Sequence, residues 1–126
     1  MKFYACGICG NMIEYVKESG MKVVCCGQEM TELIPGTSDG AAEKHVPKVT
    51  VSGNQVLVEI GSVPHPMTEE HHIEWIVMET KKGSQKVKLD VTDEPKAVFL
   101  LAKGDEFVAA YEYCNLHGLW ESEKNA

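Results

Sequence analysis

Near its middle the chain reads Gln55-Val56-Leu57-Val58-Glu59-Ile60, with an apolar β-branched residue at every second position. This period of two places the three β-branched side chains on one face of an extended strand. Gly53 and Asn54 directly precede the stretch, as in the tight turn of a β-hairpin. The sequence therefore predicts a strand here that buries one face and follows a hairpin turn.

Segments of similar β character lie on both sides of this strand and are separated by turn signals. They cover residues 46–51, 71–78, 86–91, 97–101 and 106–114. The turn signals Lys82-Gly83-Ser84 and Lys103-Gly104-Asp105 predict further hairpins. Six or seven short strands over about ninety residues predict an antiparallel β-sandwich or barrel. We find no internal repeat and no long amphipathic helix.

Composition narrows the class of protein. The 126 residues are 44% hydrophobic and 25% charged, which is enough apolar material for a core and excludes wholesale disorder. The net charge of −7 argues against a nucleic-acid partner, and the longest apolar run, residues 97–102, is too short to cross a membrane. The first ten residues contain no apolar signal-peptide region, so we expect a cytoplasmic protein.

Residues 1–34 differ from the rest of the chain. They contain four of the five cysteines and no sustained periodicity, and a turn-rich stretch, Pro35–Gly40, follows them. A segment this short needs a staple, because it cannot bury a sufficient core alone. We therefore predict two domains, a small cysteine-rich domain over residues 1–36 and a β domain over residues 37–126.

The staple predicted for the small domain is a metal ion. Cys6-x-x-Cys9 places two sulfurs on one side of a tight turn, and Cys25 and Cys26 follow without a spacer. In a reducing compartment such a pattern favours metal binding over disulfides, and a disulfide between adjacent cysteines is strained. Four thiolates suit Zn²⁺ or iron, so a purely structural zinc knuckle stays open at this point.

A second set of metal-ligand residue types is spread over the β domain. His45, His65, His71 and the pair Cys114-x-x-His117 all fall at strand ends or turns, where loops of a sandwich converge. Each histidine alone has an ordinary explanation as a hydrogen-bonded or surface residue. Together, one thiolate and several neutral imidazoles favour iron or copper over a structural zinc site.

Of the adjacent pair His71 and His72, only one side chain can point inward from an extended strand. His71 shares its face with the apolar Ile73, Trp75 and Val77. We therefore predict His71 as the ligand and His72 as a surface or neighbouring residue.

These residues in this order resemble the desulfoferrodoxins, the two-iron form of superoxide reductase, over essentially the whole chain. The most specific matches are Cys6-x-x-Cys9 with Cys25-Cys26, Glu43-Lys44-His45-Val46-Pro47, His65-Pro66-Met67 with His71, and Cys114-Asn115-Leu116-His117-Gly118. An aromatic residue would be unsurprising after the position of His71, so His72 is a departure from the family pattern.

The resemblance implies a desulforedoxin-like domain with an Fe(Cys)₄ centre, followed by an immunoglobulin-like β-sandwich with a catalytic iron. The implied ligands are Cys6, Cys9, Cys25 and Cys26 for the first iron, and His45, His65, His71, His117 and the axial Cys114 for the second. The sixth position of the second iron is implied to be open. The implied reaction is one-electron reduction of superoxide to hydrogen peroxide, for detoxification in an anaerobe or microaerophile.

The resemblance implies a catalytic role for the two charged residues before His45. Without it, Glu43 and Lys44 would be read as a solvated loop. With it, Lys44 is implied to attract superoxide and to help place the protonating water, and Glu43 to occupy the open position in the oxidised state. The family also implies a homodimer and rubredoxin as the electron donor.

Two other classes of protein compete with the enzyme at the level of sequence. A small electron carrier would need only the cysteine centre, and a zinc-binding structural module would be colourless. The second set of ligand-type residues distinguishes the enzyme from both.

Overall fold

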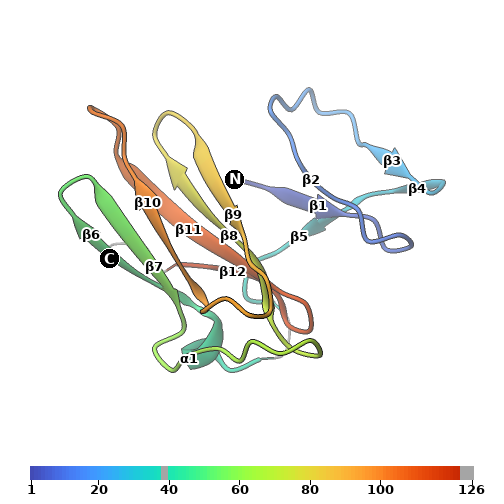
Figure 1. Cartoon of the computed structure of the whole chain (residues 1–126). Coiled ribbons are helices and arrows are strands. Elements are labelled where there is room, and N and C mark those ends of the chain that lie inside the picture. The colour runs from blue at the N-terminus through green and yellow to red at the C-terminus, as the bar shows by residue number, and fades with distance from the viewer. Residues whose placement is uncertain (38–39, 123–126) are drawn as a thin grey trace. The chain divides into compact units, whose positions relative to one another are not determined.

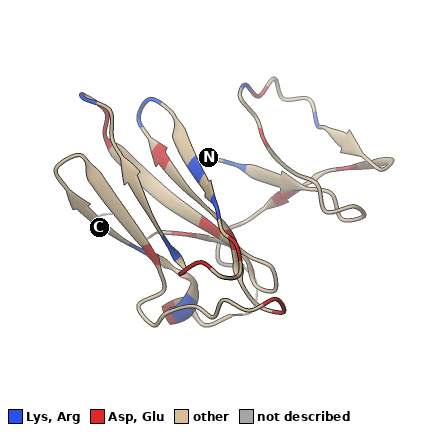
Figure 2. Cartoon of the chain, viewed as in Figure 1, with Lys and Arg blue, Asp and Glu red and all other residues tan. Residues whose placement is uncertain are grey.

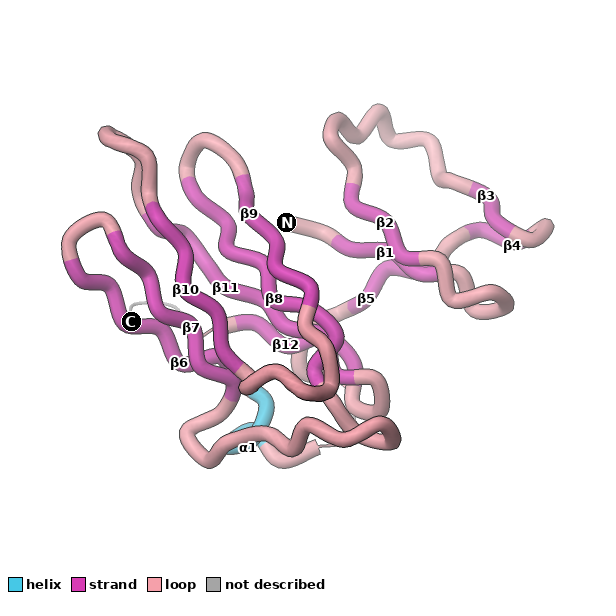
Figure 3. Tube along the Cα trace, viewed as in Figure 1, coloured by secondary structure: helices cyan, strands magenta, loops and turns pink. Residues whose placement is uncertain are grey.

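The computed structural model describes residues 1–37 and 40–122, and the chain divides into two compact units, Met1–Ile34 and Pro35–Ala126 (Figure 1). Strands dominate both units, and α1 (Ala42–His45) is the single helix of the described residues (Figure 3). No helix in this part of the chain is both long and apolar enough to cross a lipid bilayer. The mainly β architecture expected from the sequence is confirmed.

The small unit consists of very short strands around the cysteines. The strands β1 (Phe3–Ala5), β2 (Met12–Glu14) and β5 (Thr31–Leu33) form an antiparallel sheet in the order β2-β1-β5, and β3 (Val24–Cys25) pairs with β4 (Gln28–Glu29). Its buried hydrophobic residues are Phe3, Cys6 and Met30. The sequence did not reveal these strands, because two or three residues are too few to show a period.

The large unit is a sandwich of two antiparallel sheets. One sheet has the order β10-β7-β6, and the other has the order β12-β11-β8-β9. The strands are β6 (Pro47–Ser52), β7 (Gln55–Ile60), β8 (Ile73–Thr80), β9 (Ser84–Lys88), β10 (Lys96–Leu100), β11 (Phe107–Cys114) and β12 (Gly118–Glu121). The hydrophobic core lies between the sheets, with residues Val56, Val58, Ile60, Ala97 and Phe99 from one and Ile73, Ile76, Met78, Ala110 and Cys114 from the other.

The predicted turns are present, but one of them has a different role. Gly53-Asn54 joins the paired strands β6 and β7, and the turn at Gly83 joins the paired strands β8 and β9. The turn at Gly104 instead joins β10 to β11, which belong to different sheets, so it is not a hairpin. Turn residues predict a change of direction, and they do not say which strand becomes the hydrogen-bonded neighbour. The strand β12 and the helix α1 were not foreseen.

The core-facing side of β8 differs from the predicted one. Ile76 and Met78 belong to the core, whereas Trp75 stacks on Tyr113 with ring centroids 5.8 Å apart. Ile73 also reaches the core, because the register shifts between Tyr113 and Cys114 and leaves one extra residue in β8. Such a bulge reverses the alternation of faces at the point where it occurs. It lies beside the residues expected to bind metal.

Candidate metal centres

The four cysteines of the small unit meet at one point. Cys6 and Cys9 lie in the turn after β1, and Cys25 and Cys26 lie at the β3–β4 hairpin. The Sγ atoms of all four are within 4.8 Å of one another, with 3.6 Å between Cys9 and Cys25 and 3.9 Å between Cys25 and Cys26. Metal–sulfur bonds of about 2.3 Å in a tetrahedron separate the sulfurs by about 3.8 Å. The spacing of the thiols therefore fits a tetrahedral ion.

A tight hairpin allows adjacent cysteines to contribute to one centre. Cys26 and Gly27 connect β3 and β4, and their φ angles are 53° and 74°. Positive φ at both central residues defines the type I′ turn that joins two strands most tightly. Glycine adopts this conformation freely, whereas Cys26 is the one non-glycine residue with positive φ among the described residues. The strained turn places the last sulfur at the cluster.

The thiols of this cluster are prepared to bind a cation. Backbone N–H groups of Cys9 and Ile8 donate to the Sγ atom of Cys6 and lower the pKa of its thiol to about 6. Hydrogen bonds with Cys9 and Cys6 raise the pKa of Cys25, and those same neighbours raise that of Cys26 to about 12. One thiolate forms readily, and four so close together require a cation. All five cysteines of the chain are free of disulfides.

The second cluster lies at one end of the sandwich and draws on several loops. His45 ends α1, His65 lies between β7 and β8, His71 lies two residues before β8, and Cys114 ends β11. One donor atom from each of these four residues lies within 4.8 Å of all the others. His45, His65 and Cys114 are buried, and His71 is half-buried. The side chain of His71 is partly exposed, although its Nε2 atom is buried.

Backbone carbonyls orient two of the imidazoles. The Nδ1 atom of His45 lies 2.8 Å from the carbonyl oxygen of Ala41, and Nδ1 of His65 lies 2.7 Å from that of Pro66. A carbonyl only accepts, so both Nδ1 atoms carry the proton and both Nε2 atoms present lone pairs. These two Nε2 atoms are 3.2 Å apart, and the buried Nε2 of His71 has no hydrogen-bond partner.

Converging lone pairs of this kind repel one another unless a cation lies between them. Metal–nitrogen bonds of about 2.1 Å at right angles separate two nitrogens by about 3.0 Å, close to the spacing of these imidazoles. Burial lowers the pKa of His45, His65 and His71, that of His65 to about 4. The imidazoles are therefore neutral near pH 7, which is the form that binds metal. The donor set fits an ion.

His117 adjoins the cluster through Nδ1, whereas His45 and His65 present Nε2 to it. Its Nδ1 lies 3.0 Å from Nε2 of His45 and 3.9 Å from the Sγ atom of Cys114. Its backbone N–H donates to that same sulfur at 3.4 Å, whereas burial raises the pKa of the Cys114 thiol. A thiol buried among imidazoles ionises at neutral pH when a cation compensates its charge.

Trp120 supports two of the histidines and was missed by the sequence reasoning. Its ring stacks on that of His45 at a centroid distance of 5.0 Å, and its Nε1 donates to the carbonyl oxygen of His117 at 3.0 Å. A tryptophan three residues after a ligand-type histidine carries no recognisable signal by itself. Its role follows only from the pairing of β12 with β11.

Glu43 and Lys44 lie on α1 and are exposed, and both charge colours occur on this helix in Figure 2. Burial is the main cause of the lowered pKa of His45 and of His71, and the charge of Lys44 lowers both slightly further. Val63 N–H and Ser62 Oγ donate to the carbonyl oxygen of Glu43 at 3.1 and 3.2 Å. The loop after β7 thus fixes the backbone of the charged pair.

His72 does not join the cluster. Its Nδ1 lies 2.8 Å from the carbonyl oxygen of Thr68, and its N–H donates to Oδ1 of Asn115 at 2.8 Å. The structure brings His71 to the cluster, although β8 begins only at Ile73, so strict alternation along a strand does not explain the difference between the two histidines. Loop geometry separates them instead.

A buried acid lies two residues before Cys114. Glu112 is fully buried on β11, and neither carboxylate oxygen has a hydrogen-bond partner among the described residues. Burial raises the pKa of its carboxyl to about 9. The group is therefore uncharged at neutral pH and adds no negative charge beside the thiol.

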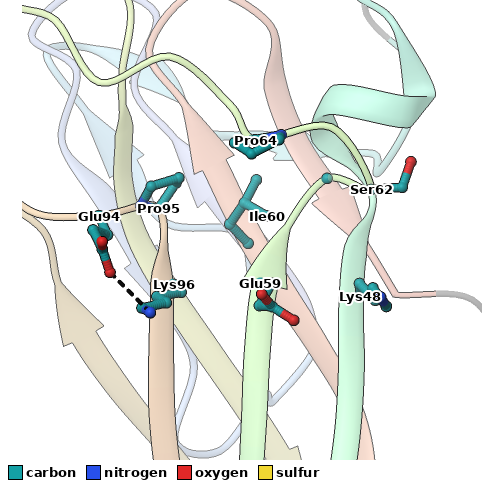
Figure 4. A pocket seen from close by; sticks show the side chains of 9 residues that line it. Lys48, Glu59, Ile60, Ser62, Pro64, Glu94, Pro95 and Lys96 are labelled. Atoms are coloured by element: carbon teal, nitrogen blue, oxygen red, sulfur yellow. Dashed lines mark ion pairs between the residues drawn. The ribbon is translucent and has the colours of Figure 1, made fainter.

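A cavity of about 250 Å³ at the end of the β10-β7-β6 sheet contains none of these donor residues (Figure 4). Its charged residues are Lys48 and Lys96 with Glu59 and Glu94, and Lys96 pairs with Glu94 at 2.8 Å. Two cations and two carboxylates cancel, so the cavity does not select an anion. The chemistry of the large unit is concentrated at the histidine–cysteine cluster.

A four-thiol centre together with a separate imidazole–thiol centre on a β-sandwich defines a class of small two-centre metalloproteins. The family model of the desulfoferrodoxin N-terminal domain matches residues 1–33, and the desulfoferrodoxin model matches residues 37–123. The chain belongs to the desulfoferrodoxin family. The Cys₄ cluster and the group of His45, His65, His71 and Cys114 fit the iron sites of this family.

Individual relatives match along nearly the whole chain. The chain is 47% identical to a desulfoferrodoxin from Nitratidesulfovibrio vulgaris, with 97% of this chain and 95% of the relative covered. It is 44% identical to a desulfoferrodoxin homolog from Archaeoglobus fulgidus, with 97% and 96% covered. The crystal structure of the superoxide reductase from Treponema pallidum superposes with a TM-score of 0.80 at 36% identity, over 97% of this chain and 96% of that one.

Proposed function

We propose that this chain is a superoxide reductase, which combines superoxide, one electron and two protons to give hydrogen peroxide. The observation that carries the proposal is the set of converging imidazole nitrogens beside a buried thiol, with the Nε2 atom of His71 buried and without a hydrogen-bond partner among the described residues. A structure of a superoxide reductase from Treponema pallidum matches over 97% of the chain, which supports this assignment. An electron carrier would need only the cysteine centre.

The proposed ligands divide into two sets. Cys6, Cys9, Cys25 and Cys26 hold one iron, and the second iron is held by His45, His65, His71, His117 and Cys114. The second iron, when bound, supplies the electron for superoxide. The carbonyls of Ala41 and Pro66 keep His45 and His65 in the tautomer that offers Nε2 to the metal.

Glu43 and Lys44 are the proposed catalytic pair of the protein surface. The ammonium group of Lys44 attracts the superoxide anion and holds a water that donates a proton to the product. The position of Lys44 on α1, directly before His45, supports this role. The carboxylate of Glu43 would occupy the open position of the centre in the oxidised state, and it would leave that position before superoxide binds. In a chain of net charge −7, a local cation is needed to attract an anion.

Four further assignments belong to the proposal, and the first two come from the resemblance to the family. We propose rubredoxin as the electron donor and a homodimer as the assembly. Five free cysteines favour a reducing compartment, for which we propose the cytoplasm. We also place the boundary of the two domains after residue 36, within the turn-rich linker.

Stoichiometry tests the proposed reaction. The iron-loaded chain, supplied with a reduced one-electron donor, should yield one hydrogen peroxide for each superoxide consumed and oxidise one equivalent of donor. No dioxygen should form, because no superoxide is oxidised. Half an equivalent of peroxide with release of dioxygen would indicate dismutation and contradict the proposal.

The zinc-loaded chain is the matched control, because Zn²⁺ occupies thiolate and imidazole sites without redox chemistry. It should remain folded, lack visible colour and give no peroxide above the uncatalysed background. Activity equal to that of the iron form would place the reaction outside the metal centres.

A further inference from the structure

His71 differs from the buried His45 and His65 in how its ring is held. The rings of His45 and His65 are each fixed by a backbone carbonyl that accepts from Nδ1. For His71, Nε2 is buried without a partner, and neither ring nitrogen pairs with a carbonyl among residues 1–37 and 40–122. Its ring contacts those of His65 and His117 at centroid distances of 4.5 and 4.9 Å, but no hydrogen bond from the described residues fixes it, so its position depends strongly on the backbone of its loop.

Bonds inside the loop give it shape but do not attach it to the sandwich. The hydroxyl of Thr68 accepts from the N–H of His71 at 3.1 Å, and the N–H of Thr68 donates to the carbonyl oxygen of His71 at 2.9 Å. These bonds close a turn of four residues. Something outside the turn must fix its distance from the thiol of Cys114.

Asn115 provides this attachment. Its Nδ2 donates to the carbonyl oxygen of Glu70 at 3.0 Å, and its Oδ1 accepts from the N–H of His72 at 2.8 Å. Its backbone N–H also donates to the carbonyl oxygen of His72 at 3.2 Å. The contacted residues directly flank His71, and Asn115 directly follows Cys114, so one amide side chain grips the loop on both sides of the imidazole.

We propose that Asn115 is a positioning residue, which sets the place of the His71 imidazole relative to the thiolate of Cys114. A primary amide suits this task, because it donates to one backbone group and accepts from another at once. Removing it leaves the N–H of His72 and the carbonyl of Glu70 without these partners and frees the loop to shift. Groups that orient metal ligands in this way typically change metal affinity by about 10–100-fold.

Loss of iron from the full-length, iron-loaded chain tests the proposal. In excess chelator, Asn115→Ala should release the iron of the histidine–cysteine centre at least about 10-fold faster than the unmodified chain. The Cys₄ iron is the internal reference, and its release rate should stay unchanged. Hydrogen exchange at the His72 amide should accelerate in the same variant, because the acceptor of that N–H is gone.

Two variants separate positioning from general stability. Val49→Ala removes half-buried apolar volume from β6, outside the segments that carry His71 and Asn115. It should leave the rate of iron loss unchanged. Asn115→Asp keeps the acceptor for His72 and loses the donor to Glu70, so its rate should fall between those of the alanine variant and the unmodified chain. It also serves if the alanine variant does not fold.

Unaltered iron loss in both Asn115 variants, or equal acceleration in Val49→Ala, would overturn the proposal. The inference rests on iron at the proposed centre, but the assay uses no superoxide. A chain that holds iron through Asn115 and reduces no superoxide would contradict the proposed function alone.

Discussion

The two metal centres of this chain are built in opposite ways. In the small unit, the sulfurs lie on turns or at the end of a strand, the strands have two or three residues, and Cys9 and Cys26 are exposed. In the large unit, the donors lie at the end of a core of ten buried residues, with His45 and Cys114 almost fully enclosed. The first centre holds together the short segments around it, whereas the second lies on a fold that is stabilised by its apolar core.

This difference assigns different work to the metal. The small unit buries little besides Phe3 and Met30, so the free energy of metal binding is also its free energy of folding. In the large unit, the carbonyls of Ala41 and Pro66 orient imidazoles through bonds that need no metal. We therefore expect the small unit to fold only when it binds metal. We expect the large unit to fold without metal and to offer a site that is already formed.

Removal of both metals should show the largest contrast. The small unit should unfold, since a structural metal contributes on the order of 10 kcal/mol in small thiolate domains. The large unit should keep its sheets, because nine of the ten residues in its apolar core are not proposed metal ligands. Amide NMR spectra of the chelated chain should lose dispersion for residues 1–34 and keep it for β7 and β11. Loss of dispersion in both units would show that the comparison is wrong.

Gly61→Ala should strongly destabilise the large unit. Gly61 has a φ of 83°, and a Cβ there would lie within 3.0 Å of the carbonyl oxygens of Val63, Lys44 and Glu43. Left-handed strain of about 1–2 kcal/mol and backbone displacement of about 1–3 kcal/mol together predict a loss near 3 kcal/mol. Denaturant unfolding followed by tryptophan fluorescence measures this loss.

Gly104→Ala is the matched control for that substitution. Gly104 has a φ of 86°, but a Cβ there would meet nothing within 4 Å. Only the backbone strain applies, so the loss should be about 1 kcal/mol. Equal losses in the two variants would mean that the turn at Gly61 does not press against the backbone of the charged pair.

Lys44→Ala should slow the reaction with superoxide without loss of either metal. Removing a local cation should lower the second-order rate by about 10-fold at low salt, and the difference should shrink as salt screens the charge. Pulse-generated superoxide measures this rate. Lys48→Ala makes the same change in net charge at the exposed second residue of β6 and should alter the rate far less. Equal rates for both variants would remove Lys44 from the proposed mechanism.

The sequence predicted the large unit better than the small one, for a physical reason. Val56, Val58 and Ile60 repeat because one face of a long strand is buried, and that repeat is visible without a structure. The strands around Cys6 and Cys25 are held by local turns, and two or three residues show no period. Cysteine spacing identified the small centre where the strand pattern failed.

For the second centre, the residue types were predictable and their supports were not. His45, His65, His71 and Cys114 come together as the sequence indicated. The groups that orient them are backbone carbonyls, the Trp120 ring and the Asn115 amide. Every residue has a carbonyl, and a tryptophan or an asparagine does not indicate a metal site by its residue type. Their roles depend on strand pairing and on the bulge in β8, which alternation alone cannot foresee.

The smallest predicted effect concerns the end of β11 that is remote from the metal. Asp105, before β11, accepts from Thr80 Oγ1 at 2.6 Å and from the N–H groups of Glu106 and Lys82 at 2.8 and 3.2 Å. The hydrogen bond from Thr80 holds the pKa of this carboxyl below its usual range. A lowered folded pKa stabilises the fold above the ordinary aspartate pKa, and this contribution is lost as the pH falls through the folded value.

Asp105→Asn should therefore lower the Tm of the large unit slightly at neutral pH, and the difference should vanish in acid. Thr80→Val should weaken the same pH dependence, because it removes the main donor. In both variants the visible spectrum and the rate of iron loss should stay unchanged, because Cys114 lies at the opposite end of β11. A change in the rate of iron loss would show that the metal centre depends on the stability of the whole sandwich. It would contradict the comparison of the two units, in which the residues around the centre hold it in place.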